Sequence, residues 1–356
     1  MGRMYRRTWG MALGLVAAAL CCAPLHGSGG AAADTAVETA ARSERVLIPG
    51  GQAVGVALKT QGVLVVAKGG GCETPLREGD VILSVDGTQV SSTAQLSACI
   101  AQMKGDSAEL CILRGSREMT VSAPVPLDEA DGKRRLGVWV RDSTAGVGTL
   151  SYVDPDTGAY GALGHAIVDA DTGSTLTVKD GALLRATVVG VTRGQSGKAG
   201  ELRGNFLKAG EQIGTLAVNG TYGIYGALSD APQASLYPQG LPVGARGSVH
   251  PGKATIISTV DAGAPEEYEV EILRCVRQDE PSPKGMVLRV TDERLLAKTG
   301  GIVQGMSGSP ILQDGRIVGA VTHVYLSDAA QGYGMYIEWM LEQSDRLAAQ
   351  QADAAA

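Results

Sequence analysis

The stretch that decides the fold runs from Thr299 to Thr322 and reads TGGIVQGMSGSPILQDGRIVGAVT. At its centre Ser307 lies between Gly305 and Gly308. The apolar residues that follow form two alternating runs separated by a turn, which is the pattern of two paired strands. Glycines let the chain turn tightly and bring backbone N–H groups close to a reacting carbonyl, so they can build an oxyanion hole beside the hydroxyl. The stretch therefore predicts a nucleophilic serine before a β-hairpin, although serine and glycine clusters also form ordinary turns.

The centre of this stretch, Gly305 to Pro310, has the pattern Gly-x-Ser-Gly-x-Pro and resembles the active-serine motif of double-barrel serine proteases. In this interpretation Ser307 is the nucleophile, and the backbone amides of Gly305, Met306 and Ser307 receive the oxyanion. Ser309 is the alternative nucleophile. It precedes a proline, and such a residue tends to be extended and is poorly placed in a sharp turn.

The chain has four histidines, and one of them lies in a second glycine-rich stretch. His165 directly follows Gly164 at the end of a short apolar strand, where an imidazole can face a cleft and exchange a proton. A single histidine is more often structural, but its combination with the glycine-framed serine favours a catalytic base. The others lie in the N-terminal segment, in a Pro-Gly turn, and in a strand that can come near the cleft: His26, His250 and His323.

The composition indicates a turn-rich β protein. Fifty glycines accompany one phenylalanine and ten tyrosines, so smaller aliphatic side chains must build the core and tight turns must join the strands. The length of 356 residues favours two or more domains. A net charge of −6 provides no basic surface for nucleic acid.

No cofactor or metal ion is expected. The sequence contains neither a GxGxxG loop nor a lysine-bearing phosphate loop. The cysteines beyond the N-terminal segment lack CxxC spacing and have no paired histidines beside them, which argues against zinc. They can be buried thiols or form a disulfide: Cys72, Cys99, Cys111 and Cys275.

The N-terminus has the pattern of an export signal. Residues 1–27 contain three arginines near the start, followed by an almost wholly apolar run. This segment is expected to be either removed or kept as a membrane anchor. Residues 28–45 show no apolar period and are predicted to be a flexible tether.

A small unit is predicted at residues 46–126. The string REGDVILSVDGTQV at residues 77–90 resembles a PDZ domain, a module that accepts an extended peptide as an added strand and holds its carboxylate on backbone amides. The alternative is a small sheet domain that only packs against its neighbour. The resemblance implies a peptide-binding loop before the second strand: Gly51, Gln52, Ala53, Val54 and Gly55.

A prolyl and charged link at residues 124–133 is predicted to end this unit, and residues 134–345 are predicted to be the catalytic domain. Short strands and frequent glycine turns over residues 178–257 favour a barrel or sandwich. The expected fold is mainly β, with a small α+β PDZ-like domain followed by a trypsin-like double β-barrel. Residues 346–356 are expected to be a disordered tail.

Two long strings point to a specific family. Residues 137–173 read GVWVRDSTAGVGTLSYVDPDTGAYGALGHAIVDADTG, and residues 299–341 read TGGIVQGMSGSPILQDGRIVGAVTHVYLSDAAQGYGMYIEWML. Behind an export segment and a PDZ-like unit, they resemble the stage IV sporulation protein B (SpoIVB) serine peptidase family.

The resemblance implies a catalytic triad of His165, Asp292 and Ser307. Asp292 precedes the serine by only fifteen residues. Asp169 and Asp171, which lie beside His165 in the sequence, are therefore the alternative acids.

The same resemblance implies a secreted signalling endopeptidase in the intermembrane space of a developing spore. Such an enzyme cuts itself near its N-terminus and cleaves a regulator of an intramembrane protease, which leads to activation of the late mother-cell sigma factor. The PDZ-like unit would bind a peptide C-terminus or a second copy of the chain. The alternative function is a non-catalytic peptide-binding scaffold with a degenerate protease fold.

Overall fold

The structure, a computed structural model, describes residues 45–69, 73–128, 131–206, 212–229, 232 and 234–355, with side chains up to residue 350. The predicted export segment and nearly all of the predicted tether lie outside the described residues. No helix in the described part is both long and apolar enough to cross a bilayer.

Six strands close into a first barrel. Each is hydrogen-bonded to the next in the order β7–β8–β12–β11–β9–β2, and β2 pairs with β7 to complete the ring. Apolar side chains from these strands fill one core cluster. The bounds are β2 (Ala53–Lys68), β7 (Val138–Val153), β8 (Ala159–Ala162), β9 (Val178–Thr192), β11 (Gln212–Gly220) and β12 (Gly223–Leu228).

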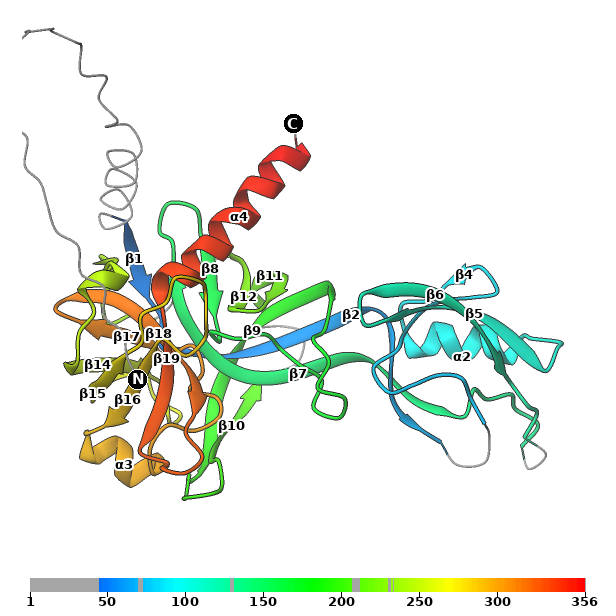
Figure 1. Ribbon diagram of the computed structural model, residues 1–356, viewed down its shortest axis with the longest axis horizontal. Coiled ribbons are helices and arrows are strands. Elements are labelled where there is room, and N and C mark those ends of the chain that lie inside the picture. The colour runs from blue at the N-terminus through cyan, green and yellow to red at the C-terminus, as the bar shows by residue number, and fades with distance from the viewer. Residues whose placement is uncertain are drawn as a thin grey trace, which may run out of the picture. The chain divides into compact units, whose positions relative to one another are not determined.

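A second closed barrel follows in the sequence, with strand order β14–β15–β16–β19–β18–β17 (Figure 1). Side chains along its strands alternate between buried and exposed, as the two-residue period of a strand with one covered face requires. The bounds are β14 (Gly252–Ser258), β15 (Glu266–Cys275), β16 (Met286–Val290), β17 (Pro310–Gln313), β18 (Arg316–Val324) and β19 (Gln331–Tyr336).

A small α+β unit is inserted between β2 and β7. It has its own apolar core cluster, and its sheet joins the far ends of these two long strands, because β2 pairs with β3 at residues 63–64 and with β7 at residues 64–68. The remaining elements of the inserted unit are β3 (Val81–Val85), β4 (Thr88–Gln89), α2 (Thr93–Ala101), β5 (Ser107–Arg114) and β6 (Arg117–Pro124).

The prediction of a mainly β chain with a trypsin-like double barrel is confirmed, but the chain order differs from the expected one. Residues 53–59, which the sequence placed in the PDZ-like unit, form a strand of the first barrel and pair with both β7 and β9. The partners of this strand lie more than eighty residues further along the chain, so its local pattern could not reveal them.

Helices and short strands connect or cover the barrels. α4 starts directly after β19 and is helical to its end, so the expectation of a disordered tail at residues 346–356 is corrected (Figure 1). Leu347 packs against the core of the second barrel, which anchors this part of the helix. The bounds are β1 (Val46–Pro49), β10 (Glu201–Phe206), β13 (Leu241–Pro242), the 3-10 helix η1 (Arg246–Ser248), α3 (Glu293–Thr299) and α4 (Ile337–Ala355).

Candidate active site

The serine loop lies between α3 and β17 and depends on two glycines. Gly305 and Gly308 have φ angles of 94° and 100°, in the left-handed region that favours glycine. A Cβ atom on Gly308 would lie 2.1 Å from the carbonyl oxygen of Thr149, and one on Gly305 would lie 2.9 Å from the Cβ of Leu202. The backbone around Ser307 can therefore come this close to the first barrel only because both positions lack a side chain.

Strand β7 of the first barrel holds this loop of the second barrel. The Thr149 amide donates to the Ser307 carbonyl at 3.0 Å, and its hydroxyl donates to the Gly305 carbonyl at 2.8 Å. β10 adds a further bond, from the Leu202 amide to the Gln304 carbonyl at 2.8 Å. The serine is thus positioned where the two barrels meet.

Two of the three predicted oxyanion donors remain available. Met306 donates its amide to the Val303 carbonyl at 3.1 Å, so its inclusion in the predicted oxyanion hole is corrected. Within the described residues no hydrogen-bond partner is found for the amides of Gly305 and Ser307. These two N–H groups can receive developing negative charge.

A strained turn places His165. β8 ends at Ala162, and the next two residues, Leu163 and Gly164, both have a φ of 69°. Leu163 is unusual there because it carries a side chain, and such backbone strain is typical of functional sites. The side chain is accommodated beside Gly148, where a Cβ atom would lie 1.8 Å from Leu163 Cδ2. The turn therefore fixes the position of His165 relative to the end of β8.

Asn219 on β11 holds the loop that follows His165. Its side-chain oxygen accepts from the Ile167 amide at 2.7 Å, and its side-chain nitrogen donates to the carbonyls of Ile167 and Leu176, both at 2.8 Å. This clamp limits the movement of the loop that carries the imidazole.

His165 and Ser307 line the same pocket, which has a volume of about 630 Å3. Its described lining contains no Asp, Glu, Lys or Arg side chain, and aliphatic residues such as Val147, Ile167 and Val324 form much of the wall. The Ser307 hydroxyl donates to the Thr322 carbonyl at 2.8 Å. The pocket brings together a hydroxyl, an imidazole and two available amides, as acyl transfer through a serine requires.

The comparison with protein families decides what this arrangement belongs to. Residues 132–341, more than half of the 356 residues, match the family model of the SpoIVB peptidase S55. The chain belongs to the SpoIVB peptidase S55 family. It is accordingly a serine peptidase. None of the curated proteins matches the sequence.

Several solved structures are similar to this S55 peptidase. The Rv3671c protease from M. tuberculosis is 15% identical in its active form, over 56% of this chain and 73% of that chain, with a TM-score of 0.31. Its inactive form is 14% identical, over 55% and 82%, also with a TM-score of 0.31. The PDZ domain of the SdrC-like protein from Listeria monocytogenes is 22% identical, over 22% and 87%, with a TM-score of 0.20.

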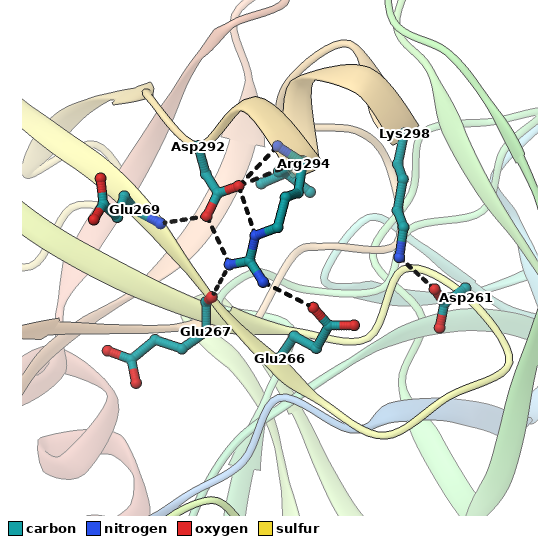
Figure 2. A network of polar contacts seen from close by, with 8 residues as sticks. Asp261, Glu266, Glu267, Glu269, Asp292, Arg294 and Lys298 are labelled. Atoms are coloured by element: carbon teal, nitrogen blue, oxygen red, sulfur yellow. Dashed lines mark hydrogen bonds and ion pairs between the residues drawn. The ribbon is translucent and has the colours of Figure 1, made fainter.

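In this S55 peptidase the predicted acid, Asp292, has other partners than His165. It caps the N-terminus of α3 by accepting from the Arg294 and Leu295 amides, and it forms an ion pair with the Arg294 guanidinium at 2.8 Å. Figure 2 shows this network, which also includes the Glu269 amide. The hydrogen bond from Arg294 is the main reason that the pKa of Asp292 lies below its ordinary value.

The expected contact between Asp292 and His165 is therefore corrected. A short helix begins immediately after the aspartate, and its unpaired amides together with Arg294 bind the carboxylate. The direction in which this cap faces depends on contacts with Arg294 and Glu269 that the sequence does not show.

The alternative acids beside His165 are also bound elsewhere. Asp169 is buried and accepts from the amides of Asp171 and Thr172 and from Arg141. Burial opposes ionisation of Asp169, but the Thr172 amide and Arg141 outweigh it and lower the pKa of the carboxyl. Asp171 pairs with the same arginine. Both aspartates fix the turn that follows the histidine.

His165 is oriented by a backbone carbonyl. Its Nδ1 atom lies 2.8 Å from the carbonyl oxygen of Ala166. A carbonyl only accepts hydrogen bonds, so this contact requires the proton on Nδ1 and leaves Nε2 as the basic nitrogen. The imidazole thus has the tautomer that a general base for Ser307 needs.

Two further predictions are settled by burial and strand pairing. Ser309 is fully buried and donates to the Ser258 hydroxyl at 3.0 Å, which excludes it as the nucleophile. The predicted peptide-binding residues 51–55 lead into a strand whose two edges already pair with β7 and β9, so no edge is open there for an added peptide. That assignment is corrected for these residues.

Sequence reasoning missed the residues that hold the site together. Nothing in the sequence singled out Thr149, Asn219 or Thr322, and their roles follow from contacts that only the fold creates. His323 was noted only as a strand residue that could lie near the cleft, and it does line the pocket. No metal-binding group of three or more acidic, histidine or cysteine side chains exists among the residues that the structure describes.

Proposed function

We propose that this S55 peptidase is a self-processing signalling endopeptidase with Ser307 as its nucleophile and His165 as its general base. The carrying observation is that both side chains line one pocket, beside the available amides of Gly305 and Ser307. The contact of Nδ1 with the Ala166 carbonyl supports the choice of base, because it leaves Nε2 free to take a proton.

The reaction follows from these positions. The Ser307 hydroxyl turns from the Thr322 carbonyl toward Nε2 of His165 and attacks the peptide carbonyl while the imidazole takes its proton. The Gly305 and Ser307 amides stabilise the oxyanion, a contribution of roughly 3 kcal/mol for each donor. His165 then protonates the leaving amine, and water releases the acyl group by the reverse sequence of proton transfers.

We further propose a role in sporulation signalling. The resemblance to SpoIVB peptidases supports export by residues 1–27 into the space between the two membranes of a developing spore. It also supports a protein substrate that regulates an intramembrane protease, with activation of the late mother-cell sigma factor as the outcome. Self-cleavage would fall in the N-terminal region, and the inserted unit would contribute contacts to a peptide or to a second copy.

The test uses the full chain and two substitutions. Parent enzyme and Ser307→Ala are compared for N-terminal self-cleavage, with Ser116→Ala, which removes an exposed hydroxyl between β5 and β6, as the matched control. We expect Ser307→Ala to stop self-cleavage and Ser116→Ala to leave it unchanged. Self-cleavage of Ser307→Ala at the parent rate would refute the assignment of the nucleophile.

A further inference from the structure

His323 is a second imidazole in the pocket of His165 and Ser307. It lies on β18 directly after Thr322, the residue whose carbonyl accepts the Ser307 hydroxyl. The ring centroids of His323 and His165 are 5.5 Å apart, and the ring planes are inclined by 44°. The proposed base therefore packs against another histidine.

Stability does not explain an imidazole at this position. Nδ1 of His323 is buried and has no hydrogen-bond partner among the described residues. A buried polar atom without a partner costs free energy that an aliphatic side chain of similar size would not. Positions where a protein breaks such a packing rule are commonly functional.

The surroundings of His323 keep it uncharged. Burial, followed by the charges of His165 and Lys284, lowers the pKa of His323 to about 4. Lys284 lies over the ring of Tyr333, the residue paired with His323 on β19, at 4.7 Å from the ring centroid. Near neutral pH, His323 is thus a neutral ring that does not repel the imidazolium forming on His165.

We propose that His323 is a positioning residue for the general base: its neutral ring packs against His165 and holds that imidazole within reach of Ser307. The inference rests on the proposed pairing of His165 with Ser307. The Ala166 carbonyl accepts from Nδ1 of His165 and His323 packs against the ring, so the two contacts together limit the orientations of the imidazole.

The proposal predicts opposite effects on stability and rate. His323→Leu removes the unpaired atom, so we expect its melting temperature to equal or exceed that of the parent. The same change frees the His165 ring, and misplacement of a catalytic group by about 1 Å can cost roughly 100-fold in rate. His323→Phe keeps a neutral ring against His165, so we expect it to retain at least a third of the parent rate, by the same positioning argument.

A carboxylate introduced at position 323 supplies a second readout, the pH dependence of activity. In His323→Asp a carboxylate beside His165 favours the imidazolium, so His165 becomes a base only at higher pH. The low-pH limb of the activity profile should therefore move to higher pH. Such a shift would show that the side chain at position 323 lies close enough to His165 to act on its imidazole.

The experiment measures labelling of the full chain by a fluorophosphonate, which reacts with an activated serine. The maximal labelling rate and the half-saturating probe concentration are obtained as a function of pH, and thermal unfolding is measured for each variant. His250→Leu serves as the matched control, because its side chain is 56% exposed and lies outside the pocket.

We expect His323→Leu to lower the maximal rate about 10- to 100-fold while the half-saturating concentration changes less than about threefold. A parent-like rate in His323→Leu, or an unmoved low-pH limb in His323→Asp, would overturn the proposal. Ser307→Ala and His165→Ala are measured alongside. If Ser307→Ala or His165→Ala is labelled at the parent rate, the proposed pairing of His165 with Ser307 is wrong. If these two variants lose labelling but the His323 variants label at the parent rate, only the proposed role of His323 is refuted.

Discussion

The hydroxyl of Thr149 donates to the carbonyl of Gly305 at 2.8 Å and joins residues that are 156 positions apart. Thr149 belongs to β7 of the first barrel, and Gly305 lies in the serine loop of the second. The catalytic arrangement is thus a property of the contact between the barrels. The carbonyls of Gln304 and Gly305 are both bound, whereas the Gly305 amide has no hydrogen-bond partner among the described residues.

This contact gives the first prediction. Thr149→Val keeps the shape of the side chain and removes the donor, so we expect a loss of about 1 kcal/mol in the free energy of unfolding and a fall in kcat that exceeds any change in KM. Thr120→Val, at an exposed position of β6, is the control. Unchanged kcat in Thr149→Val would show that the hydroxyl does not position the serine loop.

The second prediction concerns the substrate. The described pocket lining carries no charged side chain, so a charged residue of the substrate would lose its hydration there without gaining a partner. We expect a peptide library to be cut preferentially where small or apolar side chains adjoin the scissile bond. Preferential cleavage beside lysine, arginine or an acidic residue would contradict this.

A change of specificity makes this prediction sharper. Val168 lines the pocket and is 50% exposed, whereas Val189 is 65% exposed and lies outside it. Val168→Glu should increase cleavage of lysine-containing peptides roughly fivefold, the effect of a partly exposed ion pair of up to about 1 kcal/mol. Val189→Glu should leave the cleavage pattern unchanged.

The third prediction concerns Asp292. Asp292→Ala removes the cap of α3 and should cost about 1 kcal/mol of stability. Asparagine is also a good cap, so Asp292→Asn should lose mainly the ion pair with Arg294. Because Asp292 contacts other groups than His165, we expect kcat of Asp292→Asn to fall less than tenfold. A fall of about 10,000-fold, as in a triad that loses its acid, would show that the carboxylate reaches the imidazole during turnover.

The stabilisation by Asp292 should depend on pH in a defined direction. The pKa of Asp292 is lowered in the folded protein, so its contribution is complete above the unfolded value of about 3.9 and disappears as the pH falls through the folded value. The difference in melting temperature between the parent and Asp292→Asn should therefore shrink below about pH 4. A difference that stays constant well below that pH would contradict the ion-pair account.

The fourth prediction tests the loop that carries the base. Asn219→Ala removes three hydrogen bonds that hold the chain around Ile167. We expect kcat to fall at least about tenfold, because a small displacement of His165 is enough. Asn205→Ala changes an exposed asparagine on β10 and should be neutral. If both variants behave alike, the clamp has no part in positioning His165.

The sequence predicted those parts of the site that depend on local conformation. Gly305 and Gly308 are needed for a turn that only glycine accommodates, so the motif alone identified Ser307. The left-handed backbone of Leu163 and Gly164 is also a local feature, and it directly precedes His165. Short alternating strands and glycine turns likewise predicted a barrel, although β2, β7 and β9 of the first barrel are 15 or 16 residues long.

The remaining parts depend on contacts between distant segments. Nothing near Ala53 indicates that β2 pairs with β9 and not with a bound peptide, because an alternating strand fits either partner. Asp292 stands at the position in the sequence that the resemblance implies for the triad acid. Its carboxylate is nevertheless bound by Arg294, two residues later. The packing of His323 on His165 joins segments 158 residues apart, which no local pattern encodes.

The most direct test of the central claim is the site and rate of fluorophosphonate labelling in the full chain, measured by mass spectrometry of its peptides. If His165 removes the proton from Ser307 within one pocket, the adduct should be found on Ser307 alone, and His165→Ala should slow labelling at least about 100-fold. An adduct on another serine, or labelling of His165→Ala at the parent rate, would contradict the account.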